Sequence, residues 1–265
     1  MSLHESSTFT CNVSQPNPPD HIPVENRGVH TYIGFFEAGK YPEALELNRK
    51  ELKRCLDDGK VAPETIHVRL DEALILAFMD EVDEAVGCIG RTYNDCVRAH
   101  DENHKFALRT MVQYARILNC AQRYAEAEVW SEKACRLYEK NFGRTNPLTL
   151  SAIFQRAMIL DMLTSPGAAE AAEQLYEQAS AGREAALGPE HHDTIESMHH
   201  QADCLLRHNR LDVAKDVYEK VLSACRTSEE NAKERYGAPN RQKVREVEED
   251  AKAKSKNIGS PHKGY

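Results

Sequence analysis

Residues 115–127 have the sequence Ala-Arg-Ile-Leu-Asn-Cys-Ala-Gln-Arg-Tyr-Ala-Glu-Ala, and this stretch contains the pattern that decides the fold. Two alanines stand 12 positions apart, and a leucine follows the first alanine after three positions. The pattern occurs four times, with steps of 42, 42 and 45 residues between successive first alanines, and in one copy the two alanines stand 15 positions apart instead of 12. Its members are Ala73, Leu76 and Ala85; Ala115, Leu118 and Ala127; Ala157, Leu160 and Ala172; and Ala202, Leu205 and Ala214. A fixed period of this length is typical of proteins whose repeats stack on their neighbours.

The small side chains of the pattern predict two helices that cross closely, because ridges enter grooves only where the side chains are short. The leucine lies one turn beyond the first alanine on the same helix face, so we expect it in the core between layers. The unit that begins at Ala157 has three extra residues around Thr164–Gly167, and we place them in a lengthened hairpin loop. The sequence therefore predicts an all-α solenoid of stacked helix-turn-helix units.

Several segments resemble the tetratricopeptide (TPR) family, and in particular its kinesin-light-chain-like branch with about 42 residues per repeat. Residues 123–128, Arg-Tyr-Ala-Glu-Ala-Glu, resemble the start of the family's second helix, and residues 172–179 continue that pattern. The resemblance covers about residues 25–228, which accommodates five repeats, and Tyr32 replaces the first alanine in the first of them. It implies a right-handed superhelix whose concave side binds a protein or peptide.

Residues 143–149 and 188–194 resemble the linker between repeats of that family, in which a glycine is followed by a His-Pro-like pair and a threonine. Glycine ends a helix in the left-handed region, and proline prevents the helix from continuing. We expect Thr149 and Thr194 to cap the helices that follow.

Three parts of the chain differ in composition. We expect residues 1–24, which are rich in proline and serine, to be a disordered arm, residues 25–228 to be the five-repeat solenoid, and residues 229–265 to be a charged capping helix with a flexible tail. The acidic residues of the last part, Glu246, Glu248, Glu249 and Asp250, could pair in cis with Arg109 and Arg116.

Charge and composition exclude several classes of function. The formal net charge of −8 offers no basic field for nucleic acid, and no stretch approaches the roughly 18 apolar residues of a membrane span. The eight cysteines never occur as Cys-x-x-Cys, so we interpret them as small buried hydrophobic residues in a reducing compartment. We expect a cytoplasmic protein.

One cluster of residue types could carry chemistry: Cys204 with His191, His192, His199, His200 and His208. His200, Cys204 and His208 share one helix face, and their side chains are zinc ligands. Over two turns they span about 12 Å, too far for one ion. We therefore expect no metal site, with binding by a neighbouring pair as the open alternative.

No motif accompanies Cys204 and His200 that would support nucleophilic catalysis, and the chain has neither a phosphate-binding glycine loop nor His-Glu-x-x-His. We expect no catalytic residue, no cofactor and no enzyme activity.

The best candidate site is a surface that we call the first-helix stripe, formed by the positions −6, −3, +1 and +4 from each first alanine, which share one helix face. Its candidate binding residues are His67, Leu70, Leu74, Arg109, Val112, Arg116, Asn119, Ser151, Phe154, Met158, Asp161, Glu196, His199 and Asp203.

Our hypothesis is that Arg109 and Arg116 bind acidic groups of a peptide whose apolar residue packs near Phe154 and Met158. The alternative is that both arginines pair internally with carboxylates such as Asp161 or Asp203. At the level of function, an adaptor competes with a structural assembly unit that docks end to end, and with a regulatory fragment of a larger sensor protein.

Overall fold

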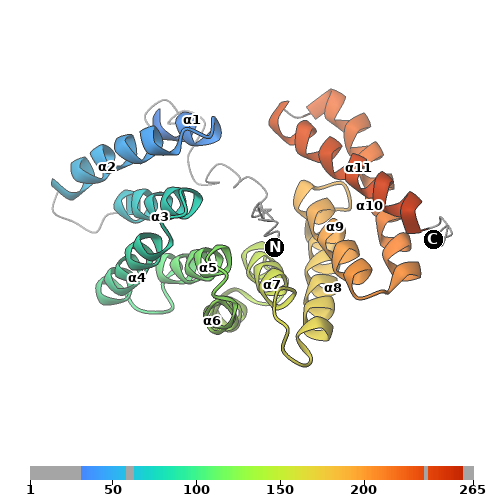
Figure 1. The fold of residues 1–265 in the computed structure, drawn as a ribbon, viewed down its shortest axis with the longest axis horizontal. Helices are drawn as coiled ribbons and strands as arrows, with labels where there is room; N and C mark the ends of the chain where they lie inside the picture. Colours follow the sequence, from blue (N-terminus) through green and yellow to red (C-terminus); the bar gives the residue numbers. More distant parts are fainter. Residues whose placement is uncertain (1–30, 58–62, 236–237, 259–265) are drawn as a thin grey trace, which may run out of the picture. The chain divides into compact units, whose positions relative to one another are not determined.

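The computed structural model describes residues 31–57, 63–235 and 238–258, and every regular element within them is an α-helix. Figure 1 shows the helices in chain order. Their bounds are α1 Thr31–Glu37, α2 Tyr41–Asp57, α3 Pro63–Phe78, α4 Val82–Ala99, α5 Lys105–Cys120, α6 Tyr124–Phe142, α7 Pro147–Leu160, α8 Ala168–Leu187, α9 His192–Arg207, α10 Leu211–Arg235 and α11 Ala238–Ile258.

The repeat pattern corresponds to five helix-turn-helix units, with first helices α1, α3, α5, α7 and α9 and second helices α2, α4, α6, α8 and α10. The prediction for the alanines is confirmed, since all eight are at most 1% exposed. The four leucines are also buried, at 7% exposure or less. Residues 161–167 form the longer connection between α7 and α8, as the extra residues predict.

The hairpin turns repeat as regularly as the helices. Asp80, Gln122 and Asn209 each adopt a positive φ near 60°, in the left-handed region. The next residue donates its backbone N–H to the carbonyl of the repeat leucine, over 3.0 Å to Leu76, 2.9 Å to Leu118 and 2.8 Å to Leu205. This is the hydrogen bond of a Schellman motif, so the leucine both fills the core and ends the first helix.

The linkers between repeats begin with glycine, as predicted, but the helices that follow them are not capped by the predicted threonines. Gly143 and Gly188 have φ of 87° and 91°, which suits glycine at a helix end. The N-cap of α7 is Asn146, which accepts from the N–H of Leu148, and the N-cap of α9 is His191. Thr149 and Thr194 are fully buried inside these helices, so their predicted capping role is wrong.

The chain divides into two compact units, residues 1–123 and 124–265. In the first unit α1 to α5 pack in chain order, and α3 also contacts α5. In the second unit α6 to α10 also pack in chain order, each helix against the next. Helix α11 packs on α10 and also contacts α9. The proposed boundary at residue 228 falls within α10, and residues 1–24 lie outside the described residues.

Helix α11 covers the apolar surface of the fifth repeat. Ala251 is fully buried, and Val247 and Ile258 pack against a cluster that includes Tyr218 and Val221 of α10. Helix α11 packs on α10 and also contacts α9, just as α5 packs on α4 and also contacts α3. Across the described ranges, no helix combines the length and the apolar character that crossing a membrane requires.

Candidate peptide-binding surfaces

In the first unit, the first-helix stripe runs over α3 and α5, which pack side by side. Leu70 is 5% exposed and belongs to the core, whereas His67 and Leu74 are partly exposed. The His67 ring meets Phe106 edge-on at 6.0 Å between centroids. This part of the stripe is thus a mixed surface with an apolar base.

Helix α5 brings four residues of the stripe to the same face. Arg109, Val112, Arg116 and Asn119 are all partly exposed. Arg116 donates from Nη1 to Oε1 of Gln113, one turn earlier, at 3.1 Å. Helical spacing therefore places the partly exposed Val112 between Arg109 and Arg116 on this face.

A partly buried carboxylate on α3, Asp71, lies next to this surface. Its Oδ2 accepts a hydrogen bond from Tyr32 Oη at 2.8 Å. Burial raises the pKa of the Asp71 carboxyl to about 6, while the Tyr32 hydrogen bond and the charge of Arg109 oppose that rise. Arg109 therefore has an internal carboxylate nearby, and it is Asp71. Sequence reasoning missed it because Asp71 stands two positions before the repeat alanine, outside the stripe.

In the second unit, the α7 part of the stripe is largely covered. Phe154 is 3% exposed, with the Arg183 guanidinium 4.6 Å from its ring centroid and the His200 ring edge-on at 5.3 Å. Ser151 accepts from Arg183 Nη2 at 3.2 Å. Met158 is partly exposed. Phe154 is consequently a core residue rather than an anchor for an incoming peptide.

The α9 part of the stripe is engaged by α11. Asp250 Oδ2 lies 2.7 Å from His199 Nε2, and Lys254 Nζ donates to Asp203 Oδ1 at 2.8 Å. Burial by itself would raise the pKa of Asp203, but His199, Lys254 and the Tyr218 hydroxyl together hold it below its usual range. Glu196 is partly exposed. The acidic residue Asp250 thus has its partners within the second unit, as does Glu248, which pairs with Lys252 at 2.5 Å.

Asp161 ends the stripe on α7, where its Oδ2 pairs with Arg207. The neighbouring histidines are dispersed. His191 caps α9, and His200 is packed between Phe154 and Tyr176, so that burial lowers its pKa. Cys204 is fully buried and lies 3.6 Å from His208 Nδ1.

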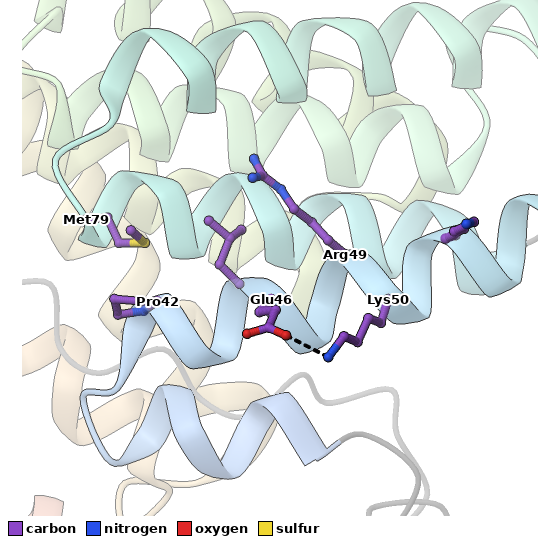
Figure 2. A pocket seen from close by; sticks show the side chains of 7 residues that line it. Pro42, Glu46, Arg49, Lys50 and Met79 are labelled. Atoms are coloured by element: carbon purple, nitrogen blue, oxygen red, sulfur yellow. Dashed lines mark hydrogen bonds and ion pairs between the residues drawn. The ribbon is translucent and has the colours of Figure 1, made fainter.

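A separate pocket lies over α2 in the first unit, and Figure 2 shows its lining. Leu45, Pro42 and Met79 supply apolar surface beside basic side chains. Lys50 is paired with Glu46 at 2.6 Å, and Arg49 is held by Glu72 and Glu84. Because carboxylates of the chain itself hold these two cations, we assign no anionic ligand to this pocket.

Comparisons with known proteins identify the repeats. Tetratricopeptide repeat family models match residues 108–148 and 161–227. No curated protein matches the chain.

Solved structures share the fold. A protein from Podosopora anserina described as kinesin light chain TPR-like repeats has a TM-score of 0.62 and 19% identity, over 79% of this chain and 95% of that one. BtubC (BKLC) from P. vanneervenii has a TM-score of 0.59 and 14% identity, over 86% and 94%. The apo form of RapI has a TM-score of 0.60 and 12% identity, over 85% and 82%. The fold is an all-α repeat solenoid similar to kinesin-light-chain-like repeats.

Proposed function

We propose that this chain, a tetratricopeptide-repeat protein, is a non-enzymatic cytoplasmic scaffold that holds a peptide segment of a partner on the first-helix stripe of its first unit. Repeats of this family and this fold support a role in protein–protein interaction in general. The finer proposal is that the peptide presents a carboxylate to the α5 arginines and an apolar side chain beside it.

The observation that carries the proposal is the face of α5. Arg109 and Arg116 are seven positions apart, which is two helical turns, so they flank Val112 on one side of the helix. Leu74 lies on α3, which packs against α5. A guanidinium group can bind a carboxylate through two parallel hydrogen bonds, which fixes the register of a peptide, while apolar contact supplies most of the affinity.

The second unit is a poorer candidate for the same peptide. Arg183 and His200 cover Phe154, and α11 pairs with His199 and Asp203. A peptide would have to displace these contacts before it could bind there. We therefore propose that the apolar side chain of the peptide contacts Leu74 and Val112, rather than Phe154 and Met158 as the sequence suggested.

End-to-end assembly through the last repeat is disfavoured by the same helix. Helix α11 buries Ala251 against the fifth repeat and carries mostly polar residues elsewhere. A docking end would instead need exposed apolar surface.

A displayed library of random peptides, selected on the purified full chain, tests the proposal. We expect the selected peptides to be enriched in Asp or Glu next to an apolar residue. A synthetic peptide from this set should lose about 10- to 100-fold in affinity, measured by fluorescence anisotropy, when Arg116 is changed to Glu, since a charge-assisted hydrogen bond contributes about 1.5 to 3 kcal/mol.

The matched control is Arg98→Glu, which makes the same charge change on the exposed side of α4. Its peptide affinity should stay within about twofold of wild type, because it lies on a second helix. Equal losses in Arg116→Glu and Arg98→Glu, or selected peptides without acidic residues, would contradict the proposal.

A further inference from the structure

Four residues with metal-ligand side chains meet where the fourth and fifth repeats join. They are Asp161 at the end of α7, Glu173 on α8, and Cys204 and His208 at the end of α9. One carboxylate oxygen of Asp161, the Cys204 sulfur and a ring nitrogen of His208 all lie within 4.8 Å of one another. Glu173 Oε1 is 3.0 Å from His208 Nδ1. Helices α7 and α9 therefore bring oxygen, sulfur and nitrogen donors together, and Glu173 of α8 contacts the nitrogen donor.

The separations between donor atoms suit one small ion. In a tetrahedral zinc site, a thiolate sulfur and an imidazole nitrogen stand about 3.5 Å apart, given the usual bond lengths. Cys204 Sγ and His208 Nδ1 are 3.6 Å apart. The two residues are one helical turn apart, a spacing that places both side chains on one face.

Two arginines orient the carboxylates from outside. Arg207 pairs with Asp161 Oδ2, and Arg210 Nη1 lies 3.2 Å from Glu173 Oε2. Each guanidinium thus occupies one oxygen and leaves the other for the cluster. Partners of this kind, which hold the ligands of a metal site in place, are a general feature of such sites.

One oxygen of the cluster lacks a hydrogen bond. The Asp161 side chain is 4% exposed, and within the described residues nothing donates to its Oδ1. Arg207 neutralises the carboxylate through Oδ2, but a buried oxygen nearly always has a hydrogen-bond partner of its own, because leaving a buried polar atom unsatisfied is costly. A cation among these donors would supply the missing interaction.

We propose that Asp161, Cys204 and His208 bind one divalent transition-metal ion of the zinc class, and that Glu173, which contacts His208, completes the site. The donor set of one sulfur, one nitrogen and two oxygens is one that zinc accepts. On binding, the Cys204 thiol loses its proton to solvent, and His208 coordinates through Nδ1 with its proton on Nε2. The ion links α7, α8 and α9, so its role is structural and independent of the first-helix stripe of the first unit.

A second group of possible ligands, His199, Asp203 and Asp250, differs in one respect. The Lys254 ammonium lies 2.8 Å from Asp203 and 2.6 Å from Asp250. The two oxygens that it contacts are the same two that face His199, so the ammonium already contacts the atoms that an ion would need. Arg207, by contrast, contacts Asp161 through Oδ2 and leaves Oδ1 without a hydrogen-bond partner among the described residues. We therefore propose no metal at the second group.

Cobalt(II) substitution of the full chain tests the site. The purified protein is stripped with a chelator under reducing conditions and titrated with Co²⁺. We expect one ion per chain, a thiolate-to-cobalt charge-transfer band and the visible bands of a tetrahedral ion, all displaced by Zn²⁺. Zinc should also raise the melting temperature of the wild type.

Cys204→Ser should abolish the charge-transfer band, whereas Cys135→Ser, which changes another buried cysteine of the same unit, should keep it. His208→Gln and Glu173→Gln, at partly exposed positions, should each weaken cobalt binding at least tenfold while circular dichroism stays unchanged. Absence of a one-to-one cobalt complex in the wild type, or a band that persists in Cys204→Ser, would overturn the proposal. If Cys204→Ser does not fold, unchanged cobalt affinity in the other two variants would overturn it equally.

Discussion

Lys254 Nζ of α11 donates to Asp203 Oδ1 of α9 at 2.8 Å, across 51 positions of sequence. The same ammonium lies 2.6 Å from Asp250, which in turn contacts His199 of α9. Charged groups of α9 and α11 thus alternate in sign across the contact. This network anchors α11 on the fifth repeat, in addition to the apolar packing around Ala251.

Lys254→Met should lower the free energy of unfolding by about 1 to 2 kcal/mol, because a partly buried charged hydrogen bond is lost and Asp203 then faces Asp250 without a cation between them. Urea unfolding at neutral pH measures the change. The control is Lys252→Met on the same helix, where only a pair with Glu248 four residues away is lost, and about 0.5 kcal/mol or less is expected. Equal losses of unfolding free energy in the two variants would show that the Lys254 network stabilises the protein no more than the pair of Lys252 with Glu248 does.

Acid should weaken the second unit through Asp203. Because the folded-state pKa of Asp203 is lowered, its stabilising contribution is present at neutral pH and is lost as the pH falls below about 4 and through the folded pKa. Thermal melts of wild type and Asp203→Asn from pH 7 downward should therefore converge at the acid end. A constant difference in melting temperature over that range would contradict the assignment.

Asp71 should give a pH dependence of the opposite sign. Burial raises its pKa from 3.8 to about 6, so the folded state holds a proton that the unfolded state has released. Stability should therefore fall as the pH rises from about 4 to about 6. Asp71→Asn keeps an oxygen for Tyr32 and removes this dependence. Urea midpoints at the two ends of that window, compared between wild type and Asp71→Asn, measure the effect, and identical slopes would exclude it.

Gly182→Ala should destabilise the protein by about 1 to 3 kcal/mol, although alanine is normally the better helix former. An added Cβ would collide with the Leu150 side chain, which is 2% exposed and has little room to move. Gly87→Ala on α4 is the matched control, because its Cβ would meet only the end of Arg91, at 3.4 Å. The melting temperature of Gly182→Ala should lie below that of wild type, and that of Gly87→Ala should lie above it.

Asn146→Ala should cost about 1 kcal/mol, because it removes the side-chain cap of α7. Thr149→Val should be neutral or stabilising, since the Thr149 hydroxyl is buried and has no hydrogen bond in the described structure. Urea unfolding of the two variants decides which residue is the cap. A larger loss for Thr149→Val would restore the threonine to that role.

Local physics explains why the sequence predicts so much of the fold. Each repeat alanine and leucine is buried by helices close to it in sequence. The regular spacing of these residues is therefore enough to predict that they are buried. Gly143 and Gly188 were also predictable, because the positive φ with which each of them ends a helix is a local property of the chain. The cap of α7 was mispredicted because Asn146 and Thr149 are both good capping residues, and the helix begins before the threonine.

Sequence by itself determined the helical hairpins, their period and the burial of their small residues, because these depend on contacts between neighbouring elements. Tertiary structure decided which candidate residues remain accessible. Arg183 and His200 cover Phe154 from other helices, and α11 pairs with His199 and Asp203 from 51 positions away. Asp161 and Glu173 likewise join Cys204 and His208 only because three helices meet there. Sequence spacing along one helix carries no information about such a meeting, since charge pairing and metal ligation depend on distances in space.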